Sequence, residues 1–241
     1  MSRGVHMKRI IVAGLALSAL TASTLIVSPS ASAVDTKNKT VKSAKVPAIK
    51  CTPTKAVGHT PPSVAPADKV LKRFPRTFTF VTNCGNIVVT TVGAKAPITV
   101  TQLATLARGG YFNNSLCHRL TTQGLYVLQC GDPTATGAGG PNFTYRDENL
   151  PPEGLNNYPA GTVAMANSTQ LKDGELINQN TNGSQFFIMA ANTTLDPYYT
   201  VWGRVTKGLE IVKAVVATGT LEGGEVGRPK VKIAIEKATV R

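Results

Sequence analysis

The chain has 241 residues, of which 42% are hydrophobic and 16% are charged, and its formal net charge is +13. This length and apolar content suffice for one well-packed core with extensions. The charge is uneven, because residues 1–33 carry +3, residues 34–75 carry +7 and residues 76–241 carry only +3. A nucleic-acid-binding domain concentrates basic residues on its fold, so this distribution argues against a nucleic-acid partner.

Residues 1–33 have the pattern of an export signal. Basic residues precede an apolar run from Ile10 to Val27, and Ala31-Ser32-Ala33 follows as a small-residue cleavage site. We expect cleavage near Ala33 and a protein that is secreted, extracellular or held in the cell envelope. The alternative is an uncleaved membrane anchor, since the run nearly reaches bilayer-spanning length, although its Ser and Thr residues weaken this alternative.

Residues 34–75 are rich in Lys, Pro, Thr, Ala and Val and have almost no large apolar residue before Leu71. Such a segment buries too little surface to fold alone, so we predict a basic, largely disordered tether. Pro61-Pro62 and Pro66 favour extended polyproline-like geometry. The tether either makes weak contact with an anionic cell envelope or is a plain solvated linker.

Four cysteines in an exported chain indicate two disulfide bonds, because such proteins meet an oxidising environment. Four cysteines allow three pairings. Cys117 and Cys130 flank a short hairpin-like apolar segment and can face each other across adjacent strands, which leaves Cys51 to join Cys84. Four unpaired buried thiols are the alternative. The histidines lie far apart and no C-x-x-C occurs, so no metal site is expected.

Residues 76–241 contain many short apolar runs separated by turns. Runs at 77–82 and 87–92 flank a turn and predict a hairpin. Ala96-Pro97 opens a helix that Gly109-Gly110 ends, and a second helix is predicted over 209–216. Further strands are expected at 116–120, 125–129, 161–166, 185–190, 199–205 and 231–240. We predict a mainly β fold, a closed eight-stranded antiparallel barrel capped by two α-helices.

The stretch from Thr181 to Ile188 joins a polar turn to a strand that begins at Gln185. Because side chains alternate along a strand, Gln185 and Phe187 share one face, while Phe186 and Ile188 share the other. One face thus offers an amide beside an aromatic wall, which suits an apolar ligand that carries a peptide group. A plain core strand after a turn is the alternative.

Six short blocks stand in order along residues 77–240. They are Cys117-His118-Arg119-Leu120, Leu128-Gln129-Cys130-Gly131-Asp132, Met165-Ala166-Asn167, the stretch Thr181 to Ile188, Val201-Trp202-Gly203-Arg204-Val205, and Gly208-Leu209-Glu210-Ile211-Val212. Together they resemble the cyclophilins, the barrel-type peptidyl-prolyl cis–trans isomerases. The Leu-Thr-Thr-x-Gly insertion after Arg119 is most similar to secreted actinobacterial members.

The resemblance implies catalysis of X–Pro rotation without a covalent step, a metal or a cofactor. The uncatalysed barrier is roughly 20 kcal/mol, and in the twisted state the proline nitrogen becomes more basic. A cation that donates a hydrogen bond towards this nitrogen favours the twisted state. Arg119 has this chemistry, and the resemblance makes it catalytic together with Gln129. A structural ion-pair partner is the alternative role for Arg119.

The resemblance also implies a substrate groove. Its residues are Tyr126, Val127, Gly137, Ala166, Asn167, Gln185, Phe187, Leu195 and Tyr199. The pocket for the proline ring is assigned to Tyr126, Val127, Phe187 and Leu195. Amide contacts are assigned to Gln129 and Gln185, backbone contacts to Ala166 and Asn167, and a neighbouring subsite to Gly137.

Several positions depart from the family pattern. Tyr199 replaces the usual pocket His, and Thr194 or a gap replaces a frequent Trp, which predicts weak cyclosporin binding. Tyr126 and Val127 replace Phe and Met, so a shallower and more polar pocket is expected. Residues 168–180 exceed the usual turn and form either a lid or subsite beside the groove, or a tolerated surface insertion.

An exported isomerase, monomeric and acting on proline-containing peptides and unfolded secreted proteins, is therefore the expected function. A catalytically weak proline-peptide-binding module or a chaperone of the cell envelope is the alternative, because of the departures at the pocket. A carbohydrate or lipid carrier is disfavoured, since Phe, Ile and Val side chains are numerous enough to fill a small barrel.

Overall fold

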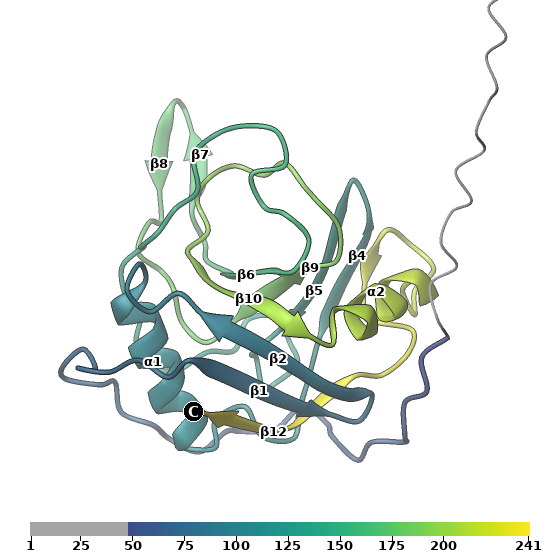
Figure 1. Cartoon of the computed structure of the whole chain (residues 1–241). Helices are drawn as coiled ribbons and strands as arrows, with labels where there is room; N and C mark the ends of the chain where they lie inside the picture. Colours follow the sequence, from purple (N-terminus) through teal and green to yellow (C-terminus); the bar gives the residue numbers. More distant parts are fainter. Residues whose placement is uncertain (1–47) are drawn as a thin grey trace, which may run out of the picture. The chain divides into compact units, whose positions relative to one another are not determined.

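Antiparallel strands and two helices make up the computed structural model of this protein, which describes residues 48–241 (Figure 1). The predicted signal peptide 1–33 and residues 34–47 of the predicted tether lie outside the described residues. The strands are β1 (Thr77–Thr82), β2 (Gly85–Thr91), β3 (Ser115–Leu116), β4 (Arg119–Gln123), β5 (Leu125–Cys130), β6 (Thr162–Met165), β7 (Gln170–Lys172), β8 (Glu175–Ile177), β9 (Phe186–Met189), β10 (Val201–Lys207), β11 (Val226–Gly227) and β12 (Ala234–Val240). The helices are α1 (Pro97–Arg108) and α2 (Leu209–Thr218).

Ten strands form one sheet in the order β11-β4-β5-β9-β6-β10-β2-β1-β12-β3, and β7 pairs with β8 apart from it. β3 and β4 are joined by only Cys117 and His118, yet they stand near opposite ends of this order. Two residues can connect them only if the sheet curls until its ends approach each other. Within residues 48–241 no ladder joins the end strands, which are two residues long. The expectation of a closed eight-stranded barrel is therefore wrong, and the fold is a curled ten-stranded half-barrel.

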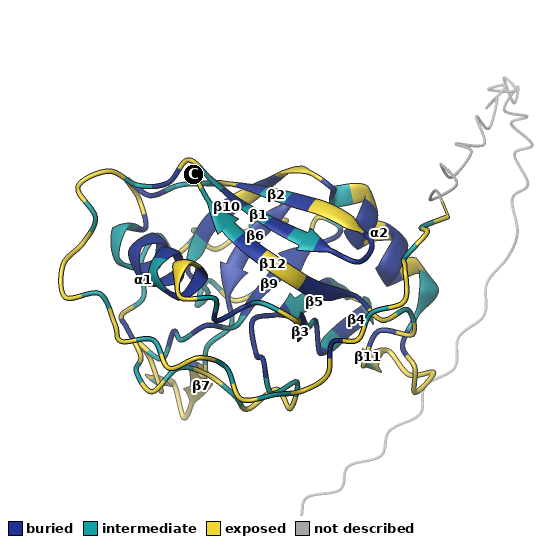
Figure 2. Ribbon diagram, turned by 90° about the horizontal axis from the view of Figure 1, so that it is seen from below, coloured by how far each residue is buried: buried dark blue, intermediate teal, exposed yellow. Residues whose placement is uncertain are grey.

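Alternation along the strands builds the main core from one face of the sheet. Phe80 of β1 stacks on Phe186 of β9 with ring centroids 5.0 Å apart, and the buried Trp202 meets Phe186 edge-on. The helices cover this core with their buried faces, which Figure 2 shows in dark blue. α1 starts at Pro97, whose fixed φ suits the first turn of a helix, and both predicted helices are confirmed.

Residues 48–75 contain no helix or strand, but they lie against the domain, and we call them the strap. Leu71 and Phe74 pack on the main core, and Ala67 exchanges two hydrogen bonds with Gln102 of α1. Figure 1 shows the strap in dark blue along the lower edge of the molecule. The expected disordered tether is thus corrected over residues 48–75, because its backbone groups and few apolar side chains find partners on the folded domain.

Both predicted disulfide bonds are present. Cys51 is bonded to Cys84, and Cys117 is bonded to Cys130. The second bond ties the link between β3 and β4 to the end of β5, so it holds the two ends of the curled sheet together. Among residues 48–241 no helix has both the length and the apolar character needed to cross a membrane.

Candidate active site

Arg119 and Gln129 are cross-strand partners on β4 and β5. Arg119 Nη1 donates a hydrogen bond of 3.0 Å to Gln129 Oε1, and Gln129 Nε2 donates one of 2.8 Å to Gln185 Oε1. Within residues 48–241 Arg119 forms no salt bridge. Its side-chain partner is instead the neutral amide of Gln129, which does not balance its charge, and this argues against a purely structural ion-pair role.

The direction of these hydrogen bonds is fixed by the loop of residues 132–139, which contacts Gln185. Gln185 Nε2 donates to the carbonyl oxygens of Gly137 (2.9 Å) and Gly139 (2.8 Å). A carbonyl can only accept, so the amide nitrogen of Gln185 must face the loop and its oxygen must face Gln129. Gln129 then has only its own oxygen left for Arg119. The loop thus sets the orientation of both amides and of the guanidinium.

A buried carboxylate holds this loop. Asp132 is fully buried, and its oxygens accept hydrogen bonds from the backbone N–H groups of Thr134, Thr136, Gly137 and Gly139. Burial acts to raise the pKa of Asp132, but the hydrogen bonds outweigh it, so the pKa lies below its ordinary value. A Cβ on Gly139 would overlap Asp132 Oδ1, so only glycine allows this close approach.

An apolar pocket lies beside Arg119. It has a volume of about 110 Å³ and is lined by Arg119, Leu125, Val127, Phe187, Leu195 and Tyr199. Phe187 and Tyr199 meet edge to face with centroids 5.4 Å apart, over the buried Tyr158. Burial raises the pKa of Tyr199, so its hydroxyl stays neutral at physiological pH. The pocket can hold a small apolar ring within reach of a fixed cation.

Tyr126 does not line this pocket, which corrects the sequence prediction. Alternation along β5 sends Leu125, Val127 and Gln129 to the groove and Tyr126 to the opposite face. Tyr126 packs on the main core and borders a separate cavity with Lys213 of α2. Leu125, which the sequence analysis missed, takes its place in the pocket, and the period of two along β5 was the signal that could have found it.

A second, more polar cavity of about 460 Å³ contains the other predicted groove residues. It is lined by Gln129, Gly137, Ala166, Asn167 and Gln185, among others. The Arg119–Gln129 hydrogen bond connects the two cavities, because Arg119 lines the first and Gln129 lines the second. The sequence predicted Ala166 as a backbone contact, but its N–H already donates to the Gln185 carbonyl, which leaves only its carbonyl for a ligand.

The insertion 168–180 forms the β7–β8 hairpin. Leu171 and Leu176 are opposite each other on its two strands and are 60% and 39% exposed. Its base is held by the hydrogen bond from Ser168 N to Thr181 Oγ1, and both of these residues line the polar cavity. The insertion therefore borders the groove, while its role as lid or surface insertion stays a prediction. Thr194 is exposed and lines neither cavity.

Residues 77–240 match the family model described as "Cyclophilin type peptidyl-prolyl cis-trans isomerase/CLD". The chain belongs to this cyclophilin-type family. The match begins just after the strap and covers every helix and strand described above.

Relatives of known sequence agree with this assignment. The "Probable peptidyl-prolyl cis-trans isomerase B" of Mycobacterium leprae is 41% identical over 166 residues, covering 64% of this chain and 53% of that protein. The protein of the same name in Mycobacterium tuberculosis is 36% identical over 197 residues, covering 73% of this chain and 61% of that protein. The matched region thus spans little more than half the length of these relatives.

A solved structure shows the same fold. The cyclophilin type peptidyl-prolyl cis–trans isomerase of Cryptosporidium parvum superposes with a TM-score of 0.58 at 25% identity, covering 70% of this chain and 98% of that one. A second structure of that protein, in the presence of the dipeptide Ala-Pro, superposes with a TM-score of 0.56 at 26% identity. The curled half-barrel described here is thus the cyclophilin fold.

Proposed function

We propose that this chain is a peptidyl-prolyl cis–trans isomerase that accelerates rotation about X–Pro bonds in exported proteins. The observation that carries the proposal is the Arg119 guanidinium, held by Gln129 Oε1 at 3.0 Å on the rim of an apolar pocket of about 110 Å³. Membership of the cyclophilin-type family supports the activity. The C. parvum relative studied with Ala-Pro supports a proline-containing peptide as the ligand class.

The proposed mechanism needs no covalent step. The proline ring enters the pocket formed by Val127, Phe187 and Leu195, and the residue before the proline extends towards the polar cavity. Twisting the X–Pro bond weakens amide resonance and makes the proline nitrogen a better acceptor. Arg119 keeps N–H groups beyond the one bound to Gln129, and these donate to that nitrogen. The twisted state is thereby stabilised more than either planar state.

Export is part of this proposal. It is supported by the signal-like pattern of residues 1–33 and by the two disulfide bonds, which persist in oxidising compartments. We place the protein outside the cytoplasm, secreted or in the cell envelope, with unfolded secreted proteins as its clients.

A proline-peptide-binding module with little catalysis is the second candidate. Tyr199, which stands in the pocket where the family usually has His, is the observation that favours it. Binding an apolar ring requires only the pocket, whereas catalysis requires the cation to act on the twisted state.

A rate measurement separates the two. The mature protein is added to a proline peptide, and cis–trans exchange is followed by NMR at equilibrium, so that no protease is needed. The isomerase proposal predicts exchange that increases in proportion to enzyme concentration. Peptide chemical shifts that move on binding, with exchange at the uncatalysed rate, would contradict catalysis and support the binding module.

A further inference from the structure

The strap is first fixed to the domain at its N-terminal end. Besides the Cys51–Cys84 bond, Thr52 N donates to Asn83 O (2.9 Å) and Asn83 Nδ2 donates to Thr52 O (2.8 Å). Asn83 is buried, and its side chain also accepts from Ala234 N of β12 at 2.8 Å. The start of the strap is therefore joined to the β1–β2 turn by one covalent bond and by a polar network, which Asn83 extends to β12.

The strap is fixed again at α1. Ala67 N donates to Gln102 Oε1 at 2.9 Å, and Gln102 Nε2 donates back to Ala67 O at 3.1 Å. Val64 packs so closely on Gly109 that a Cβ there would crowd its methyl groups. Both ends of the strap are thus held to regular structure.

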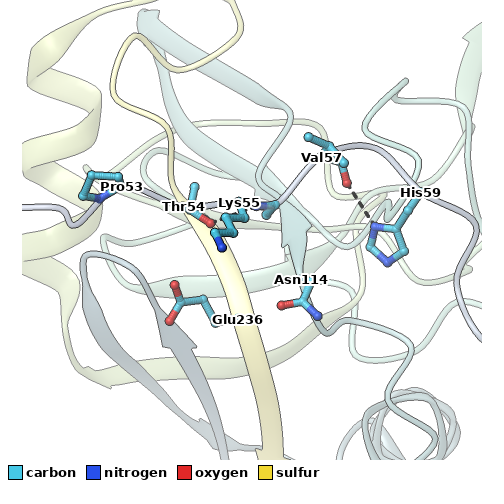
Figure 3. A pocket seen from close by; sticks show the side chains of 8 residues that line it. Pro53, Thr54, Lys55, Val57, His59, Asn114 and Glu236 are labelled. Carbon is cyan, nitrogen blue, oxygen red and sulfur yellow. Dashed lines mark hydrogen bonds between the residues drawn. The ribbon is translucent and has the colours of Figure 1, made fainter.

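Between these ends the strap touches the active-site loop. His59 N donates to Pro133 O at 2.9 Å. Gly58 lies so near Thr134 that a Cβ on Gly58 would overlap the Thr134 carbonyl oxygen. Figure 3 shows the hydrogen bond from His59 Nδ1 to Val57 O, 3.0 Å long, within the segment that makes this contact.

Next to the buried Ala56, the strap borders open space at this point. Its residues before His59 border a cavity of about 670 Å³, with Asn114 and Glu236 on the far side (Figure 3). A second cavity of about 220 Å³ lies among Val57, His118 and Ala135. The contact of Gly58 and His59 with the loop therefore lies between two cavities.

The loop that receives this contact directs the catalytic groups. Pro133 and Thr134 lie in the same loop as Gly137 and Gly139, the glycines whose carbonyls hold Gln185. Gln185 in turn orients Gln129, and Gln129 orients Arg119. A shift of the loop therefore changes the aim of the guanidinium and the shape of the polar cavity.

We propose that Gly58 and His59 are positioning residues of the active site, which brace loop 132–139 and thereby set both the guanidinium and the subsite beside it. This inference rests on the proposed isomerase function. The strap precedes residues 77–240, so the brace is an addition to the part of the chain that matches the family.

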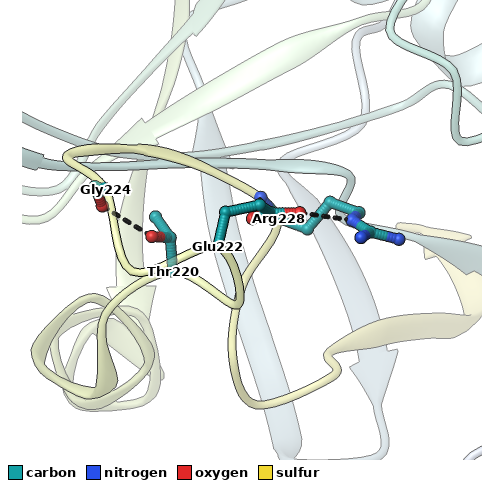
Figure 4. A network of polar contacts seen from close by, with 4 residues as sticks. All are labelled: Thr220, Glu222, Gly224 and Arg228. Atoms are coloured by element: carbon teal, nitrogen blue, oxygen red, sulfur yellow. Dashed lines mark hydrogen bonds and ion pairs between the residues drawn. The ribbon is translucent and has the colours of Figure 1, made fainter.

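The test uses three glycine-to-alanine variants of the mature protein. In Gly58→Ala the added Cβ meets the backbone of Thr134, and Gly58 is outside the left-handed region, so the change tests the contact alone. Gly109→Ala crowds Val64 and disturbs the strap away from the loop. Gly224→Ala lies in the turn after α2, beside the Glu222–Arg228 ion pair of Figure 4, where a Cβ meets nothing closer than 3.8 Å.

The main readout is the ratio of kcat/KM for an Ala-Pro and a Leu-Pro peptide, because a partly unfolded sample changes both values equally. Gly58→Ala is expected to lower kcat/KM by about tenfold and to change the ratio by about threefold, since small misplacements of catalytic groups are costly. Both controls are expected to keep the ratio of the wild type. An unchanged ratio in Gly58→Ala, or the same change in Gly109→Ala, would overturn the brace.

Hydrogen exchange gives a second readout that does not depend on activity. The amides of Gly137 and Gly139 are bound to Asp132, and Gly58→Ala is expected to speed their exchange by about tenfold while β1 and β2 keep theirs. Unchanged protection would overturn the brace even if the wild type proved inactive. An inactive wild type with this exchange pattern would instead refute the proposed function and retain the brace.

Discussion

Arg119 and Gln129 lie directly opposite each other on β4 and β5, with Nη1 and Oε1 3.0 Å apart. An arginine on a strand has several rotamers of similar energy, so its aim depends on what fixes its end. Here the fixing group is a neutral amide whose own orientation is set by Gln185 and two glycine carbonyls. The direction of the guanidinium is therefore defined, while no acidic side chain among residues 48–241 pairs with its charge.

Removing the amide should impair catalysis more than binding. In Gln129→Leu, Arg119 loses its acceptor, and we expect kcat to fall by about tenfold, the equivalent of a charged hydrogen bond, with KM changed less than about threefold. Gln123→Leu, at the exposed end of the partner strand β4, is the matched control. Steady-state isomerisation kinetics measure both, and an unchanged kcat in Gln129→Leu would show that the amide does not orient the cation.

The placement of Leu125 and Tyr126 can be tested as a pair. Leu125→Ala removes a wall of the apolar pocket, and we expect peptide Kd to rise by about fivefold, as for the loss of one to two buried methylene groups. Tyr126→Phe removes a hydroxyl on the opposite face, and Kd should stay within about twofold of the wild type. NMR titration with one proline peptide measures both. The reverse pattern would place Tyr126 in the pocket.

Stability should fall on mild acidification because of His118. Burial lowers its pKa below the ordinary 6.5 and Arg119 adds to this shift, while Asp132 and the nearby Gln185 amide oppose it. Between the lowered pKa of the folded protein and 6.5, His118 binds more protons in the unfolded chain than in the folded one. The free energy of unfolding therefore increases as pH rises through this window and decreases as pH falls.

Urea unfolding from pH 7.5 to 5.5 measures this effect. We expect the unfolding free energy of the wild type to decrease over this range and that of His118→Gln to change less. Comparing slopes rather than absolute values removes any constant cost of the substitution. Equal slopes in the two proteins would show that His118 titrates alike when folded and unfolded.

The Cys117–Cys130 bond should contribute more to stability than a surface contact. It closes a loop with a sequence separation of 13. The chain-entropy model assigns such a loop about 3 kcal/mol, so Cys117→Ala/Cys130→Ala should lower the unfolding free energy by about that amount. Urea denaturation with Cys51–Cys84 intact measures it. A loss below about 0.5 kcal/mol would mean that the denatured chain gains little conformational entropy when the disulfide bond is removed.

The sequence predicted most helices and strands well, because side-chain alternation and helix-terminating residues depend only on neighbouring positions in the chain. Gln185 and Phe187 share a face as predicted, and α1 begins at Pro97. Tyr126 was assigned to the proline pocket on the family resemblance, whereas alternation along β5 predicts that it points to the opposite face.

Some contacts between segments far apart in the chain could not be predicted from the sequence. The strap is poor in large apolar residues, and its main contact with the loop is a backbone hydrogen bond from His59 to Pro133, which composition does not record. The open sheet was missed because β3 and β11 are only two residues long, too short to leave a clear pattern.

The central claim is that the Arg119 guanidinium stabilises the twisted X–Pro bond. Arg119→Ala and Arg119→Lys, compared with the wild type in the NMR exchange experiment, test it most directly. We predict that Arg119→Ala lowers kcat/KM by about 100-fold, as for loss of a preorganised donor, that Arg119→Lys recovers only a small part, and that peptide Kd changes less than about threefold. An Arg119→Ala variant that isomerises as fast as the wild type would contradict the claim.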